Sequence, residues 1–284
     1  MTEPAREDAP LLRFGVVADP QYADLPGNPA TGRYYAESLA KLTAAIDHFN
    51  REDLAFVVTL GDLIDRDWEN FDAVLPLYER LRHKNHILLG NHDFSVAAER
   101  LAEVFARVGM PAPYYSFAVG TYRFIALDGN DVSTFAPPVG DPRRALAAER
   151  LAALQQAGAD NAQSWNASLS DTQFAWLQQR LAAAKLAGEQ VVVLGHYPIW
   201  PPGSHTMWDA ERIAALLSGQ DHVLAYLSGH DHRGNLGHRG RTAFVNFRGM
   251  VDTPDDNAYA IVEIHADRLQ IFGFGREPSR TLPF

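Results

Sequence analysis

The sequence contains no cysteine among its 284 residues. That absence excludes a disulfide-stapled scaffold, a cysteine nucleophile, a thiolate zinc site and an iron–sulfur cluster. Any bound metal would therefore need nitrogen and oxygen ligands. Basic residues are also few, because 25 Lys and Arg stand against 35 Asp and Glu, which gives a formal net charge of −10. This charge has the wrong sign for binding nucleic acid through its phosphates, and we expect no nucleic-acid partner.

Long hydrophobic runs are missing as well. Uninterrupted apolar runs such as Val191–Leu194 fall far short of the ~20 residues that span a bilayer. The first residues include acidic side chains, and no basic region precedes a long apolar stretch, unlike in a secretory signal peptide. We therefore expect a soluble, cytoplasmic protein without a membrane partner. The sequence leaves the oligomeric state open.

What the sequence does contain is enough apolar material for a large core, since 46% of its residues are hydrophobic. Against about 150 residues per domain, the length allows one large domain or two small ones. No linker, internal repeat or low-complexity tract divides the chain, so we predict a single domain over residues 1–284. Periodicity weakens and prolines gather in residues 128–168. We predict that this segment is an insertion or a lid.

Apolar runs alternate with stretches of helical periodicity. Leu11–Ala18 and Leu54–Leu60 are predicted strands, and Tyr34–Asn50 between them carries apolar residues on one helical face. This pattern is a βαβ unit. Further strands are predicted at 86–89, 114–119, 122–127, 191–194, 223–227, 244–247, 259–264 and 269–274, and further helices at 71–81, 96–108 and 170–188. The order predicts an α/β fold with two packed mixed β-sheets flanked by helices.

Five predicted strands end in short turns that carry side chains able to bind a metal. The turns are Asp19-Pro20-Gln21, Gly61-Asp62, Gly90-Asn91-His92-Asp93, Gly195-His196 and Gly229-His230-Asp231-His232. Taken singly, a Gly-Asp turn or a lone histidine is usually structural. Together they supply only Asp, Asn, Gln and His, and ligands of α/β sheets sit beyond the carboxyl ends of the strands. The five turns therefore predict one metal site.

In this order the five segments resemble the calcineurin-like metallophosphoesterase superfamily. Its motifs are Asp-x-His, Gly-Asp, Gly-Asn-His-Asp/Glu, Gly-His and Gly-His-x-His, and the sequence departs from them only at Gln21, which replaces the first histidine. The resemblance implies a four-layer αββα sandwich and two divalent metal ions that share one carboxylate. One ion would be held by Asp19, Gln21, Asp62 and His232, and the other by Asp62, Asn91, His196 and His230.

Such a centre would make the chain a metal-dependent phosphohydrolase. Two divalent ions about 3.5–4 Å apart acidify a bridging water, and the resulting hydroxide attacks phosphorus in line. Asp62, as the shared ligand, would be essential. His92 is the candidate to protonate the leaving oxygen or to bind the transition state, with Asp93 orienting its imidazole. Asp65 and Asp231 are expected to lie behind the ligands or to face solvent.

A closer resemblance is to the manganese-dependent ADP-ribose/CDP-alcohol diphosphatases. The segments that carry it are Asp19-Pro20-Gln21-Tyr22-Ala23-Asp24, Arg33-Tyr34-Tyr35, Gly229-His230-Asp231-His232, Thr253-Pro254-Asp255 and Gly273-Phe274-Gly275-Arg276. It implies a small phosphorylated substrate, a nucleoside diphosphate linked to a sugar or alcohol, such as ADP-ribose or CDP-choline. Cleavage of the diphosphate would give a nucleoside monophosphate and a phosphorylated sugar or alcohol. The implied ions are Mn²⁺, with Mg²⁺, Fe and Zn²⁺ as alternatives.

Residues that bind the rest of the substrate carry a weaker signal. Arg33 is a candidate partner of the distal phosphate. Tyr22, Trp200 and Trp208 are predicted to stack on a nucleobase, with Phe135 and Trp165 as further candidates, although packing in the core or in a loop is the commoner role of each such residue. Two other functions stay open: a phosphodiesterase acting on cyclic nucleotides or other phosphoesters, and a non-catalytic scaffold of the same fold. The intact Asn91-His92 pair argues against the scaffold.

Overall fold

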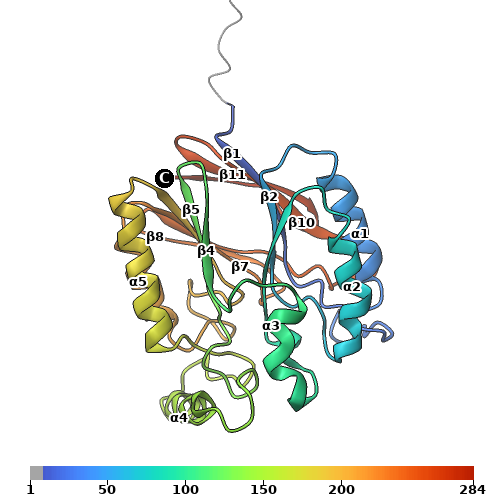
Figure 1. Cartoon of the computed structure of the whole chain (residues 1–284). Helices are drawn as coiled ribbons and strands as arrows, with labels where there is room; N and C mark the ends of the chain where they lie inside the picture. Colours follow the sequence, from blue (N-terminus) through green and yellow to red (C-terminus); the bar gives the residue numbers. More distant parts are fainter. Residues whose placement is uncertain (1–8) are drawn as a thin grey trace, which may run out of the picture.

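The computed structural model describes residues 9–284 and contains two six-stranded β-sheets packed between helices (Figure 1). The first sheet has the order β12 (Arg280–Pro283), β11 (Arg268–Gly275), β10 (Ala258–Ile264), β1 (Leu12–Val17), β2 (Phe56–Leu60), β3 (Lys84–Leu88). The second has the order β4 (Tyr115–Val119), β5 (Tyr122–Ala126), β6 (Gln190–Leu194), β7 (Val223–Ser228), β9 (Thr242–Asn246), β8 (Asn235–Arg239). Both sheets are mixed: β1 to β3 run parallel, as do β5, β6, β7 and β9, while the pairs β1–β10, β10–β11, β11–β12, β4–β5 and β8–β9 are antiparallel. The predicted pair of mixed sheets is confirmed.

Helices cover the outer face of each sheet. Figure 1 shows α1 and α2 against the first sheet and α5 against the second. The α-helices are α1 (Ser38–Phe49), α2 (Phe71–Tyr78), α3 (Val104–Arg107), α4 (Pro142–Gln156), α5 (Asp171–Leu186) and α6 (Ala210–Ser218), and 3-10 turns occupy Trp68–Asn70, His92–Phe94 and Ala98–Glu103. Among residues 9–284 no helix is both long and apolar enough to cross a membrane.

The core is built in layers because strand side chains alternate between the two faces of each sheet. Phe14, Phe56 and Phe124 point between the sheets, and the rings of Phe14 and Phe56 stack with centroids 4.9 Å apart. Val17 of β1 and Val57 of β2 point outward to α1 and α2. Burial on both faces makes the central strands almost continuously apolar, and this is why the sequence reveals them.

Several elements differ from the sequence expectations. The first helix begins at Ser38 and not at Tyr34, and the stretch expected as one helix over 96–108 is a 3-10 turn followed by the short α3. The periodicity did not reveal α6, β8 or β12. The edge strand β8 is mostly exposed, so it lacks an apolar pattern. Helix α5 begins as expected, since the Ser170 side chain accepts a hydrogen bond from the Gln173 amide.

The segment 128–168 holds the unexpected helix α4. Only Ala147 of this helix is buried, which explains why its sequence shows little amphipathic pattern. Arg144 fastens the start of α4 to the preceding loop by donating to the carbonyls of Thr134, Phe135 and Pro137. The role of this segment as an insertion or lid stays a prediction.

Candidate metal centre

The predicted metal ligands gather where five strands end. Asp19 follows β1, Asp62 follows β2, and Asn91 follows β3 of the first sheet. From the second sheet, His196 follows β6, while His230 and His232 follow β7. The carboxyl ends of the parallel strands thus bring side chains from residues 19 to 232 to one place, as the sequence indicated.

The backbone of these loops is unusual. Asp19, Gln21, Asp62 and His230 have positive φ angles of 50°, 46°, 53° and 71°. For residues other than glycine this left-handed conformation costs on the order of 1–3 kcal/mol, and it persists where the surroundings hold it. Gly90 is required for a different reason, since a Cβ there would lie 2.1 Å from Asp62 Oδ1.

The ligand atoms form two overlapping groups. Atoms of Asp62, His196 and His230 lie within 4.8 Å of one another, and so do atoms of Asp19, Asp62 and His232. Asp62 belongs to both groups. All five side chains are buried, as a site that excludes bulk water requires. The arrangement can hold two cations that share one carboxylate.

Asp62 and His230 have pKa shifts that suit cation binding. Burial raises the pKa of Asp62, but the imidazoles of His196 and His92 outweigh that effect, so its pKa lies well below the usual range. Burial, together with His196, holds the pKa of His230 well below its usual value, so His230 is neutral. A carboxylate and a neutral imidazole are the forms that bind metals.

Two of the candidate ligands, His196 and His232, are oriented by groups that lie outside the metal site. The Nδ1 atom of His196 lies 2.8 Å from the carbonyl of Leu60, and its Nε2 atom lies 3.4 Å from Asp62 Oδ2. The Nδ1 atom of His232 lies 2.8 Å from Asp252 Oδ1. Outer contacts of this kind fix the tautomer and leave the other ring nitrogen facing the site. No sequence pattern singled out Asp252.

His92 lies at the pocket but does not have the expected partner. Its Nδ1 atom is 3.0 Å from Asp65 Oδ1. The carboxylate of Asp93 instead accepts hydrogen bonds from the backbone amides of Leu63, Ile64 and Gly90. The expectation that Asp93 orients the imidazole is therefore wrong, and Asp65 takes that place. Asp93 shapes the two loops that carry Asp62 and Asn91.

Gln21 occupies the position where the superfamily pattern has histidine. Its side chain is fully buried. The amide nitrogen donates to Asp65 Oδ1 at 3.0 Å, and the amide oxygen accepts from Arg33 Nη1 at 3.2 Å. Gln21 thus joins Arg33 to the carboxylate that holds His92. Its role as a ligand stays a prediction.

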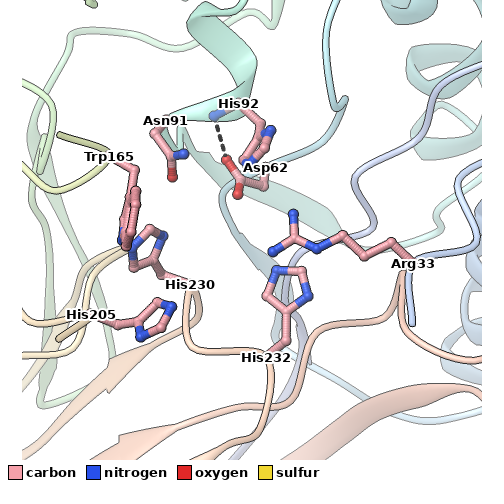
Figure 2. Close-up of a pocket in the computed structure, with 8 residues that line it drawn as sticks. All are labelled: Arg33, Asp62, Asn91, His92, Trp165, His205, His230 and His232. Carbon is pink, nitrogen blue, oxygen red and sulfur yellow. Dashed lines mark hydrogen bonds between the residues drawn. The ribbon is translucent and has the colours of Figure 1, made fainter. Parts of the chain in front are cut away.

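A cavity of about 370 Å³ opens above these residues. It is lined by Arg33, Asp62, Asn91, His92, Trp165, His205, His230 and His232. In Figure 2 the Arg33 guanidinium lies on one side of Asp62, and Trp165 and His205 lie on the other. Trp165 is 43% exposed, and its ring centroid is 6.2 Å from that of His205. His205 was not predicted, because no motif surrounds it.

The other predicted stacking residues lie elsewhere. Tyr22 is buried beside the first sheet and does not line the cavity. Trp208 packs on Val132 and Ala147, and its indole donates to the Gln163 carbonyl. Trp200 donates to the His238 carbonyl. Since neither tryptophan lines the cavity, the expectation that these three rings contact a base is not supported, and Trp165 is the aromatic residue in place.

The family model described as calcineurin-like phosphoesterase matches residues 12–234 of the chain. The chain belongs to this family. The match covers all five strand-end turns, so the resemblance found in the sequence is confirmed. The two mixed sheets flanked by helices are the metallophosphoesterase fold.

Individual relatives give a more specific comparison than the family model does. The mouse manganese-dependent ADP-ribose/CDP-alcohol diphosphatase is 27% identical over 327 residues, covering 100% of this chain and 96% of the relative. The Arabidopsis thaliana protein of the same name is 27% identical, covering 95% of this chain and 96% of its own. A zebrafish dimetal phosphatase structure superposes with a TM-score of 0.87 at 24% identity, covering 97% of this chain and 100% of that one. The chain is a metal-dependent hydrolase, and Mn²⁺ is the favoured divalent ion.

Proposed function

We propose that the chain hydrolyses the diphosphate of nucleoside diphosphates linked to a sugar or an alcohol, using two divalent ions. The observation that carries this proposal is the overlap of two ligand groups at Asp62, on the floor of a cavity with a cationic side and an aromatic side. Such a substrate has an anionic centre with organic groups at both ends. The names of the relatives support the same substrate class.

The donor set fits two divalent ions. Asp19, Gln21, Asp62 and His232 would hold one, and Asp62, Asn91, His196 and His230 the other. Carboxylate, amide and imidazole donors without thiolate suit Mn²⁺. When bound, a pair of such ions supplies activation of a water for attack on phosphorus and neutralises phosphoryl charge.

The remaining steps fall to side chains of the chain itself. Asp65 holds Nδ1 of His92, so Nε2 is the ring nitrogen left to serve the pocket, where it can give a proton to the leaving oxygen. The guanidinium of Arg33 reaches the same pocket and can pair with the second phosphate. The hydrogen bond from Arg33 to Gln21 holds the guanidinium toward the candidate metal ligands.

A substrate panel tests the proposal. ADP-ribose, CDP-choline, cyclic AMP and p-nitrophenyl phosphate would be compared at matched Mn²⁺, with phosphate-containing products followed by chromatography. We expect the two diphosphates to have the highest kcat/KM, with AMP and ribose 5-phosphate as products from ADP-ribose. Faster cleavage of cyclic AMP would instead assign the site to a phosphodiesterase.

A further inference from the structure

Asn166 lies behind the candidate ligand His230 and is not part of any strand-end turn. Its side chain is fully buried. The amide nitrogen donates to the backbone carbonyls of Asn161 at 3.0 Å and Ser204 at 2.7 Å. The amide oxygen lies 3.1 Å from Nε2 of His230.

These contacts determine which way the amide faces. A backbone carbonyl only accepts hydrogen bonds, so the two carbonyls require the NH₂ group of Asn166 on their side. The oxygen must then face His230, and an oxygen acceptor requires a proton on the imidazole Nε2. Since a neutral imidazole carries one proton, the lone pair of His230 is on Nδ1.

We propose that Asn166 is a positioning residue that fixes the ring orientation and tautomer of His230, so that Nδ1 is the atom offered to a metal. Leu60 and Asp252 do the opposite for His196 and His232, because each contacts Nδ1 and leaves Nε2. The inference rests on the proposed metal site.

Asn166 also links the candidate metal ligands to the side of the cavity that Trp165 and His205 form. Asn161 donates to the Met207 carbonyl at 2.7 Å, and the Trp208 amide donates to the Ala167 carbonyl at 2.8 Å. These bonds hold segment 161–167 against the loop that carries His205. Asn166 therefore lies between these loops and His230, whose ring centroid is also 5.4 Å from that of His205.

The test compares Asn166→Ala with Asn161→Ala as a matched control. Both variants remove an asparagine that joins the two loops, but only Asn166 contacts His230. Calorimetric titration of the metal-free proteins with Mn²⁺ should show one site weakened by about 10–100-fold in Asn166→Ala, the usual effect of losing an outer partner of a ligand. Asn161→Ala should bind both ions as wild type does.

Asn166→Asp separates positioning from stability. It keeps an oxygen toward His230 but loses both donors to the carbonyls, so we expect a lower Tm together with Mn²⁺ affinity at or above that of wild type, because a carboxylate also accepts from Nε2 and adds a negative charge. If affinity follows Tm across the three variants, Asn166 has a structural role only and the proposal fails.

A spectroscopic measurement on the wild-type protein covers the case in which Asn166→Ala does not fold. With ¹⁵N-labelled histidine and bound ¹¹³Cd²⁺, His230 should couple to cadmium through Nδ1, and coupling through Nε2 would overturn the proposal. Wild-type protein that binds no Mn²⁺ would overturn the proposed function as well. Normal wild-type binding with unchanged affinity in Asn166→Ala would overturn this inference alone.

Discussion

The floor of the cavity and its outer wall are built in different ways. The floor consists of side chains that directly follow buried strands, such as Asp19, Asp62 and His196, and each belongs to a short local turn. The wall consists of Trp165 and His205, which come from two loops without regular structure. Hydrogen bonds between side chains and backbone carbonyls, as well as between backbone groups, hold those loops together.

This difference separates the residues that carry out the chemical step from the residues that recognise the substrate. Reacting groups must be placed within fractions of an ångström, and strand ends of a packed sheet provide that rigidity. Groups that recognise the ends of a substrate lie on loops, which can vary while the scaffold stays the same. Changes in the floor should therefore affect metal binding and the chemical step, whereas changes in the wall should affect substrate affinity.

The largest effect is expected for Asp62→Ala, because this carboxylate belongs to both ligand groups. We expect activity on ADP-ribose to fall below detection and Mn²⁺ content, measured by elemental analysis, to fall with it. Asp24→Ala is the control, since Asp24 is an exposed carboxylate after the same strand as Asp19 and does not line the cavity. Two bound ions and near-normal turnover in Asp62→Ala would exclude a shared carboxylate.

The second-largest effect is expected for His92→Ala and concerns the chemical step alone. His92→Ala should keep both ions but lose about 10²–10⁴-fold in kcat, as expected for a general acid. The loss should shrink for p-nitrophenyl esters, because p-nitrophenolate leaves without a proton. Equal losses for both kinds of leaving group would assign His92 to binding phosphoryl charge instead.

Substitutions of Asp65 and Asp93 test which of these two carboxylates orients His92. Asp65→Asn should lower kcat, since Asp65 touches the imidazole, and should lower Tm only through its lost ion pair with Arg66. Asp93→Asn should lower Tm, since three backbone amides depend on that carboxylate. The reverse pattern would restore Asp93 as the residue that orients His92.

Most of the fold could be predicted from the sequence because its central strands are buried on both faces. Val191–Leu194 and Val223–Leu227 are apolar without interruption, so their boundaries are visible. Helix α4 and strand β8 escaped because they are mostly exposed and their side chains carry no periodic pattern. Their positions depend on long-range contacts such as those of Arg144.

The residues of the candidate site also divide into those that could be predicted from the sequence and those that could not. The ligand turns could be found because each follows a predicted strand. The partner of His92 was misassigned since Asp93 is its neighbour in sequence, yet the 3-10 turn at His92–Phe94 directs the Asp93 side chain to backbone amides. Asn166, His205 and Asp252 reach the site through tertiary contacts that no local spacing encodes.

A smaller effect is expected at Gln21, where a neutral amide oxygen replaces the imidazole nitrogen of the superfamily pattern. Gln21→His should favour Zn²⁺ or Fe at that site and weaken the dependence on added Mn²⁺, because nitrogen is the softer ligand. Gln21→Leu is the control: it also breaks the contact with Arg33 but offers no ligand. Activity would be measured against metal identity for all three proteins. Identical metal profiles for wild type and Gln21→His would remove support for Gln21 as a ligand.

The smallest effect is expected in the wall. Trp165 lines the cavity and is 43% exposed, so its indole is accessible to a nucleobase. Stacking is worth about 1–3 kcal/mol per base, so Trp165→Ala should raise KM for ADP-ribose by roughly 5–150-fold with kcat nearly unchanged. Substrates without a base or other aromatic ring should be unaffected.

Trp200→Ala is the matched control for that prediction, because Trp200 is also a partly exposed tryptophan on a loop but lies outside the cavity. Its KM for ADP-ribose should equal that of wild type. A fall in kcat in Trp165→Ala would contradict the division between floor and wall, since the wall would then act on the chemical step. An equal rise in KM in both variants would mean that the loop after His196, and not the ring of Trp165, contacts the base.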